Sequence, residues 1–134
     1  MKTTLLFLLL TLSTSLIGQE FVESPSLDDY IQGQSAFGDD EHNIIVVEFW
    51  IEWNKANAFG HSNKLEGIDG YYLVNAGKNV SLKDEYEVMI APTLLVFVDG
   101  IEERRYKAGL DMKCPVDLST LQEDIKEILT SLNF

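Results

Sequence analysis

The sequence is poor in the residue types that most reactive sites need. Cys114 is the only cysteine among 134 residues, so an intrachain disulfide is impossible and stability must come from an apolar core. Only two histidines are present, His42 and His61, and they do not have the spacing of a metal-binding pair. No glycine-rich phosphate-binding motif is present either. We therefore expect neither a cofactor nor a metal ion.

Positive charge is also scarce, with 10 Lys and Arg residues against 22 Asp and Glu residues and a formal net charge of −12. A strongly acidic domain repels phosphate backbones, so we expect no binding to nucleic acid. The charge suits solubility, or attraction to a basic partner.

The N-terminal region has the layout of a secretory signal. Lys2 supplies a positive charge, residues 5–10 are all apolar, and Gly18 offers a small residue at the end. The apolar run is too short for a membrane span, and no cysteine follows it for lipid attachment. We predict a signal peptide at 1–18, a domain at 19–134, and a periplasmic or secreted protein without a stable membrane span. A buried N-terminal helix or a retained anchor is the alternative.

The remaining chain alternates between strand and helix patterns. Apolar runs rich in β-branched residues predict strands, and apolar residues at helical spacing predict helices. The predicted strands are 44–50, 71–74, 93–98 and 101–107, and the predicted helices are a short one after Ser26, 56–66, a turn at 82–86, and 118–132. Asp99-Gly100 predicts a tight hairpin between the last two strands. This order predicts a small mixed sheet of four or five strands flanked by helices on both faces.

Four segments in this order resemble thioredoxin. They are Val47-Glu48-Phe49-Trp50-Ile51-Glu52-Trp53, Ile90-Ala91-Pro92-Thr93, the strand and hairpin at 94–100, and Arg105-Tyr106-Lys107-Ala108-Gly109. The resemblance covers essentially the whole domain, and the segments have the order and spacing found in thioredoxin. The chain is therefore similar to the thioredoxin-like family. The resemblance implies an α/β thioredoxin-like fold with a cis bond before Pro92.

The likeness stops at the two redox cysteines of the family. Asn54 and Asn57 occupy the positions of the Cys-x-x-Cys motif, in the run Asn54-Lys55-Ala56-Asn57. Thiol–disulfide exchange needs an attacking thiol and a resolving thiol, and an amide can act as neither. We predict that this motif is redox-inactive and has no catalytic residue. Asn54 is expected to cap the following helix, and hydrogen bonding to a bound ligand is its alternative role.

Glu48 is an acidic residue inside an apolar predicted strand, and it matches the buried acid of the family. Burial destabilises a carboxylate, so we predict a raised pKa for Glu48. The family often has a lysine facing this acid, whereas Leu73 falls near that position here. Three roles stay open for Glu48: a structural residue with a polar or water partner, an exposed carboxylate at the strand end, and a functional acid.

The resemblance also implies a peptide-binding groove beside Pro92. In thioredoxin-like proteins the residue before this proline offers backbone groups to an extended peptide, which adds as a strand. Ala91 is small and leaves such a groove open, Trp53 is expected to form one wall, and Ala108-Gly109 another. The expected partner is an unknown protein or peptide client. The alternative is an inherited feature of the fold without a client.

Cys114 follows the last predicted strand and is expected near the same edge of the sheet as Pro92. Three functions therefore remain. The first is an exported, redox-inactive module that binds a protein or peptide. The second is a weak thiol–disulfide oxidoreductase in cell redox homeostasis that works through Cys114. The third is a structural domain of a larger assembly.

Overall fold

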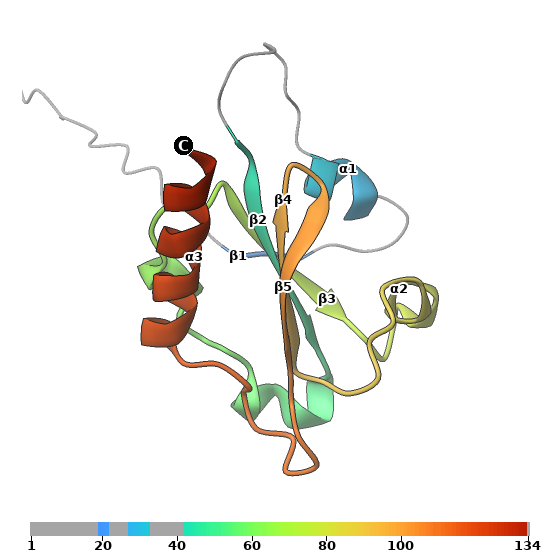
Figure 1. The fold of residues 1–134 in the computed structure, drawn as a ribbon. Helices are drawn as coiled ribbons and strands as arrows, with labels where there is room; N and C mark the ends of the chain where they lie inside the picture. Colours follow the sequence, from blue (N-terminus) through green and yellow to red (C-terminus); the bar gives the residue numbers. More distant parts are fainter. Residues whose placement is uncertain (1–18, 22–26, 33–41, 134) are drawn as a thin grey trace, which may run out of the picture.

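The computed structural model describes residues 19–21, 27–32 and 42–133, so the predicted signal peptide at 1–18 lies outside the described residues. Five strands form one mixed sheet in the order β1-β3-β2-β4-β5 (Figure 1). Their bounds are β1 Gln19–Phe21, β2 Ile44–Trp50, β3 Gly70–Asn75, β4 Thr93–Val98 and β5 Ile101–Lys107. β3 is parallel to β1 and β2, whereas β4 is antiparallel to β2 and β5. The predicted mixed sheet is confirmed.

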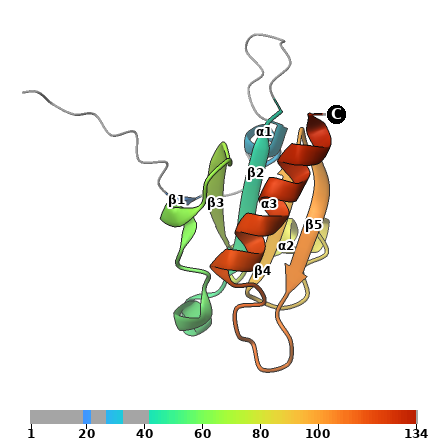
Figure 2. The ribbon, with the colours of Figure 1, turned by 60° about the vertical axis from the view of Figure 1, so that its left-hand side comes forward.

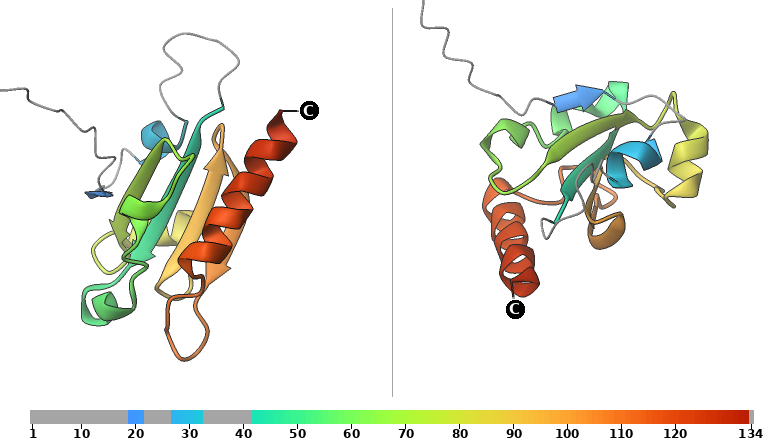
Figure 3. Two further views of the ribbon diagram at one scale, coloured as in Figure 1. Left: turned by 90° about the vertical axis from the view of Figure 1, so that its left-hand side faces the viewer. Right: turned by 90° about the horizontal axis from the view of Figure 1, so that it is seen from above.

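Helices cover both faces of this sheet. They are α1 Leu27–Gln32, α2 Val80–Glu85 and α3 Leu118–Leu132. Figures 2 and 3 show α3 lying along one face of the sheet, and α1 and α2 pack against the other. Alternate residues of β2 enter the two layers: Ile44 and Val46 pack beneath α3, and Ile45 and Val47 pack beneath α1 and α2. Because β2 is covered on both sides, its sequence is apolar almost without interruption.

α3 is the amphipathic helix that the sequence predicts at 118–132. Its residues Leu121, Ile125 and Ile128 are buried against the sheet. The carboxylate of Asp117 caps its first turn by accepting a 2.7 Å hydrogen bond from the backbone N–H of Thr120. Within the described ranges, no helix has the length and apolar character that crossing a membrane requires.

The predicted hairpin between β4 and β5 is confirmed. Asp99 and Gly100 have φ values of 51° and 83°, and two positive φ angles in succession are those of the tight turn that matches the twist of paired strands. β5 lies at the edge of the sheet and is largely exposed, in keeping with its charged sequence.

The connection from β2 to β3 differs from the prediction. The sequence predicts a helix over 56–66, but two short 3₁₀ helices are found instead, η1 (Glu52–Asn57) and η2 (Ser62–Lys64). Gly60 and Gly67 have φ values of 68° and 81°, which lie outside the helical region. The helical prediction for this segment is therefore wrong.

A long-range contact explains the difference. Phe59 is buried in the core beneath α3, and its backbone N–H donates a 3.0 Å hydrogen bond to the carboxylate of Glu48. An N–H used in this way is not available for a helical hydrogen bond, and tertiary contacts readily override helix propensity. The sequence also predicts no strand at β1, because three residues are too few to show a strand period.

The sheet brings the predicted site residues to one of its ends. The carboxyl ends of β2, β3 and β5 meet the start of β4 there, because Trp50 pairs with Asn75 while Thr93 pairs with Phe49 and Lys107. This end is the lower one in Figure 1, where η1 and the loop after β5 lie side by side.

Candidate functional site

Asn54 joins three loops at this end of the sheet. Its Nδ2 donates hydrogen bonds to the backbone carbonyl oxygens of Met112, at 2.9 Å, and Ala91, at 3.3 Å. Its Oδ1 accepts a 2.7 Å hydrogen bond from Nδ2 of Asn57. Carbonyl oxygens only accept hydrogen bonds, so the nitrogen of the Asn54 amide must be the atom that faces them.

The predicted capping role of Asn54 is wrong. Asn54 lies inside η1 with non-helical φ and ψ of −117° and 18°, and the residue that precedes the first turn is Ile51. No side chain in the described part of the chain caps η1 through a hydrogen bond. The reason is that Ala91 and Met112 lie close to Asn54 in space, and their carbonyl oxygens take the hydrogen bonds of its amide group.

The peptide bond between Ala91 and Pro92 is cis, as the resemblance implies. Hydrogen bonds fix the chain before and after this peptide bond. The hydroxyl of Thr93 donates a 2.6 Å hydrogen bond to the carbonyl oxygen of Ile90, and the N–H of Ala108 donates a 3.1 Å hydrogen bond to the carbonyl oxygen of Pro92. These contacts hold the Ala91-Pro92 segment against the neighbouring loops.

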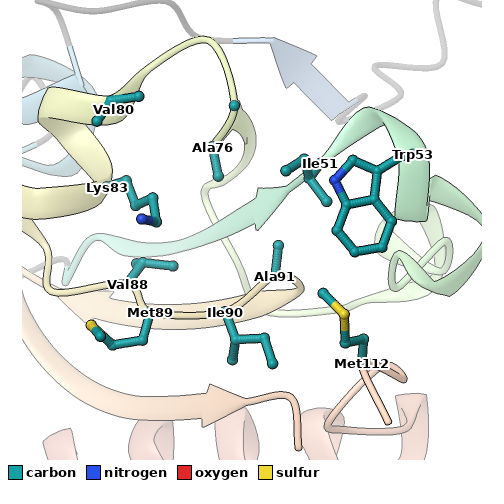
Figure 4. Close-up of a pocket in the computed structure, with 11 residues that line it drawn as sticks. Ile51, Trp53, Ala76, Val80, Lys83, Val88, Met89, Ile90, Ala91 and Met112 are labelled. Atoms are coloured by element: carbon teal, nitrogen blue, oxygen red, sulfur yellow. The ribbon is translucent and has the colours of Figure 1, made fainter. Parts of the chain in front are cut away.

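A mostly apolar groove of about 310 Å³ runs beside this segment (Figure 4). Its lining residues come from the segment after β2, η1, the β3–α2 connection, α2, the segment before β4 and the loop after β5. They are Ile51, Trp53, Ala76, Gly77, Val80, Lys83, Val88, Met89, Ile90, Ala91 and Met112. Trp53 and Met89 are 69% and 83% exposed, which is unusual for side chains of this size and polarity.

Some of the predicted groove residues line this groove and others do not. Trp53 and Ala91 are in the lining, whereas Pro92 and Ala108 are not. Ala108 is buried, and Met112 lies across from Trp53 instead. The loop after β5 places Met112 there by a turn in which the N–H of Met112 donates to the carbonyl oxygen of Gly109 at 2.9 Å. Met112 and Lys83 carry no sequence signal that identifies them as lining residues.

Glu48 is completely buried, which excludes an exposed carboxylate at the strand end. Its two oxygens accept hydrogen bonds from the hydroxyl of Tyr71, at 2.5 Å, and from the N–H of Phe59, at 3.0 Å. Burial raises the pKa of Glu48 and outweighs these two hydrogen bonds, which act to lower it. The predicted raised pKa is thus confirmed. Leu73 is the β3 residue paired with Glu48, so no lysine occupies that position.

Cys114 does not line the groove. It is half-buried and contributes to a second cavity of about 510 Å³, together with His61 and Asp117. Its Sγ lies 3.2 Å from the carbonyl oxygen of Val116. Burial raises the pKa of the Cys114 thiol, and the nearby carboxylates of Glu48 and Asp117 raise it further. A raised pKa lowers the fraction of reactive thiolate at neutral pH.

The described residues contain no group of three or more His, Cys, Asp or Glu side chains that could hold a metal ion. Nδ1 of His42 lies 2.6 Å from a carboxylate oxygen of Asp99, whose other oxygen accepts a hydrogen bond from the N–H of Asn43. The ring of His61 packs edge-on against Phe59. Both histidines therefore have local structural contacts.

The arrangement of strands and loops is similar to that of solved thioredoxin structures. A mutant thioredoxin from Halobacterium salinarum is matched over 86% of this chain and 94% of that chain, with 16% identity and a TM-score of 0.67. A thioredoxin from Schistosoma mansoni is matched over 84% and 97%, with 14% identity and a TM-score of 0.61. Thioredoxin f2 from Chlamydomonas reinhardtii is matched over 83% and 96%, with 14% identity and a TM-score of 0.59.

The chain has a thioredoxin-like fold. No protein-family model matches its sequence, and no curated protein sequence matches it either. At this level of identity the likeness concerns the fold. In this thioredoxin-like chain, Asn54 and Asn57 lie in η1, and Asn54 donates a hydrogen bond to Ala91, whose peptide bond to Pro92 is cis.

Proposed function

We propose that this thioredoxin-like chain is an exported protein that binds an extended segment of another protein in the groove beside Pro92, without exchanging disulfides at positions 54 and 57. The observation that carries the proposal is the amide group of Asn54. This amide group is hydrogen-bonded to Ala91, Met112 and Asn57. These hydrogen bonds hold together the loops that border an open apolar groove.

The groove has the character of a peptide-binding site. An exposed indole and flexible thioether side chains adapt to varied apolar partners, and Trp is among the residues that contribute most to binding energy in interfaces. The carbonyl oxygen of Ala91 accepts one long hydrogen bond from Asn54, and a carbonyl oxygen has a second lone pair for a peptide N–H. Loops held by hydrogen bonds before binding reduce the entropy lost on association.

Export is part of the proposal and is supported by the leader pattern in residues 1–18. Redox inactivity is supported by chemistry: an amide side chain cannot attack a sulfur atom or resolve a mixed disulfide. The groove itself contains no thiol among its lining residues.

The binding test uses the purified protein and pools of labelled synthetic peptides, each containing one phenylalanine or leucine. We expect saturable binding that Trp53→Ala weakens about ten-fold or more, as for a tryptophan at the centre of an interface. Ile101→Ala is the matched control, because Ile101 is also a large exposed apolar residue but is the first residue of β5, at the end of that strand away from the groove. Equal losses in both variants would contradict groove binding.

A weak oxidoreductase working through Cys114 is the second candidate. Its support is that Cys114 borders a cavity of about 510 Å³ and is not fully buried. An insulin-reduction assay with an external thiol separates the two functions. We expect no turnover by the wild-type protein. Turnover that Cys114→Ser abolishes would replace the proposed function with this one.

A further inference from the structure

Among the residues that the structure describes, Lys83 is the one charged side chain in the lining of the groove. It lies on α2, at the end of the groove away from Trp53, with Val88 and Met89 close by in Figure 4. Lys83 is half-buried, and every other lysine in the described ranges is exposed. An ammonium group held among apolar side chains loses part of its hydration, and an anionic partner offsets that loss.

The described residues of the chain do not supply that partner. Lys55, Arg104 and Arg105 each lie within 4.0 Å of a glutamate oxygen, but the ammonium of Lys83 forms no ion pair with any described residue. This is notable in a chain with 22 acidic residues and 10 basic ones. The partner must then be water or an incoming group.

Four acidic residues stand next to lining residues in the sequence, namely Glu52, Asp84, Glu87 and Asp111, and two of them have partners of their own. The carboxylate of Glu52 lies 3.1 Å from Nζ of Lys55. The carboxylate of Asp111 accepts a 3.2 Å hydrogen bond from the N–H of Lys113. None of the four has a carboxylate oxygen within 4.0 Å of Nζ of Lys83. The groove therefore presents apolar surface at one end and, at the other, a positive charge that has no ion-pair partner among the described residues.

We propose that the groove selects extended peptide segments in which one large apolar side chain and one aspartate or glutamate lie on the same side of the strand. The apolar side chain packs between Trp53 and Met112, and the carboxylate binds the ammonium of Lys83. Side chains two or four residues apart point the same way in an extended segment, which makes this combination possible. This inference rests on the proposed peptide-binding function.

The net charge of the whole chain acts against an acidic peptide at long range, but salt screens that effect over roughly 8 Å at physiological ionic strength. A contact with Lys83 inside the groove is screened much less. The preference should therefore be measured at physiological salt, between peptides that differ by a single isosteric charge.

The experiment compares three pools of labelled peptides of equal length, blocked at both ends, each with one central phenylalanine. The pools carry glutamate, glutamine or lysine at positions two and four residues from it. We expect the glutamate pool to bind about five-fold more tightly than the glutamine pool, the upper range for a partly exposed ion pair. Lys83→Gln should remove this difference between the glutamate and glutamine pools.

Charge reversal and matched controls complete the design. Lys83→Glu should make the protein prefer the lysine pool, and Lys83→Arg should keep the preference for glutamate. Lys126→Gln removes an exposed lysine from α3, on the other face of the sheet, and should change nothing. A glutamine pool with free carboxyl ends tests the other source of a carboxylate. Tighter binding of that pool alone would overturn the role assigned to side-chain acids.

The outcomes separate this inference from the proposed function. If all three pools bind, and bind more weakly to Trp53→Ala, but Lys83→Gln leaves their ranking unchanged, the charge selectivity is wrong and the groove function stands. If no pool binds in a manner that depends on Trp53, both are wrong. If the protein forms a dimer that peptides dissociate, the occupant is a second copy of the chain, and the proposed client is wrong.

Discussion

Asn54→Asp offers a sharp test of how this end of the molecule is held together. The change keeps the size and shape of the side chain and replaces its NH₂ group with a carboxylate oxygen. In the native arrangement that position faces two carbonyl oxygens, at 2.9 Å from Met112 and 3.3 Å from Ala91. Two attractive contacts thus become two repulsive ones at neutral pH.

The magnitude follows from these contacts. Loss of one intramolecular hydrogen bond lowers the free energy of unfolding by about 1 kcal/mol, and placing a charge against acceptors adds to that loss. Asn54 is half-buried, so water relieves part of the repulsion. We expect Asn54→Ala to lower the free energy of unfolding by about 1–2 kcal/mol, and Asn54→Asp by about 2–3 kcal/mol at pH 7.

The measurement is urea denaturation of the wild-type protein and the two variants, followed by intrinsic tryptophan fluorescence. Lys55→Ala is the matched control, since Lys55 neighbours Asn54 in η1 and makes only an exposed ion pair with Glu52 at 3.1 Å. That pair should contribute less than about 0.5 kcal/mol. Lowering the pH below the usual range of an aspartate should restore part of the stability of Asn54→Asp, because the protonated acid regains a donor.

A capping residue behaves differently. Asp and Asn are nearly equivalent caps of a helix N-terminus, so a capping role predicts little change in Asn54→Asp. If Asn54→Asp is as stable as the wild type, or if Lys55→Ala is equally destabilising, the bridging role assigned to Asn54 is refuted.

Two further predictions concern the core and the hairpin. The pKa of Glu48 is higher in the folded chain than in the unfolded chain, so the folded state binds the proton more tightly. The free energy of unfolding of the wild type should therefore fall relative to that of Glu48→Gln as pH rises above about 4.5. A difference in free energy of unfolding that stays constant in urea denaturation between pH 4 and pH 8 argues against this. Gly100→Ala should lower the melting temperature, because φ is 83° at this residue and an added Cβ lies 2.7 Å from Oε1 of Gln32. Gly109→Ala is the control and should not lower it, because an added Cβ there has no contact closer than 3.5 Å. Similar melting temperatures for the two variants would count against the turn geometry.

The architecture was largely predictable because its signals are local. The apolar run at 44–50, the Asp99-Gly100 turn and the periodic pattern at 118–132 each depend on neighbouring residues, and each corresponds to an observed element. The raised pKa of Glu48 was predictable for a similar reason, since an acid within a strand covered on both faces must be buried.

The details of the site were not predictable in the same way. Asn54 was expected to cap a helix because Asn often does so, but its partners lie 37 and 58 residues away along the chain. The helix expected at 56–66 is absent because Phe59 donates to Glu48, a contact that no propensity reports. Met112 replaces Ala108 as a groove residue through the path of the loop after β5.

The sequence by itself therefore determined the order of β2, β3, β4, β5 and α3, the sheet class and the absence of both motif thiols, because these depend on patterning and composition. Only the tertiary structure decided which groups meet at the end of the sheet: the amide of Asn54 with two distant carbonyl oxygens, Trp53 with Met112, and Lys83 with an apolar groove. The physical reason is that hydrogen bonds and grooves form between residues brought together by folding, and their geometry depends on loops whose course no local pattern specifies.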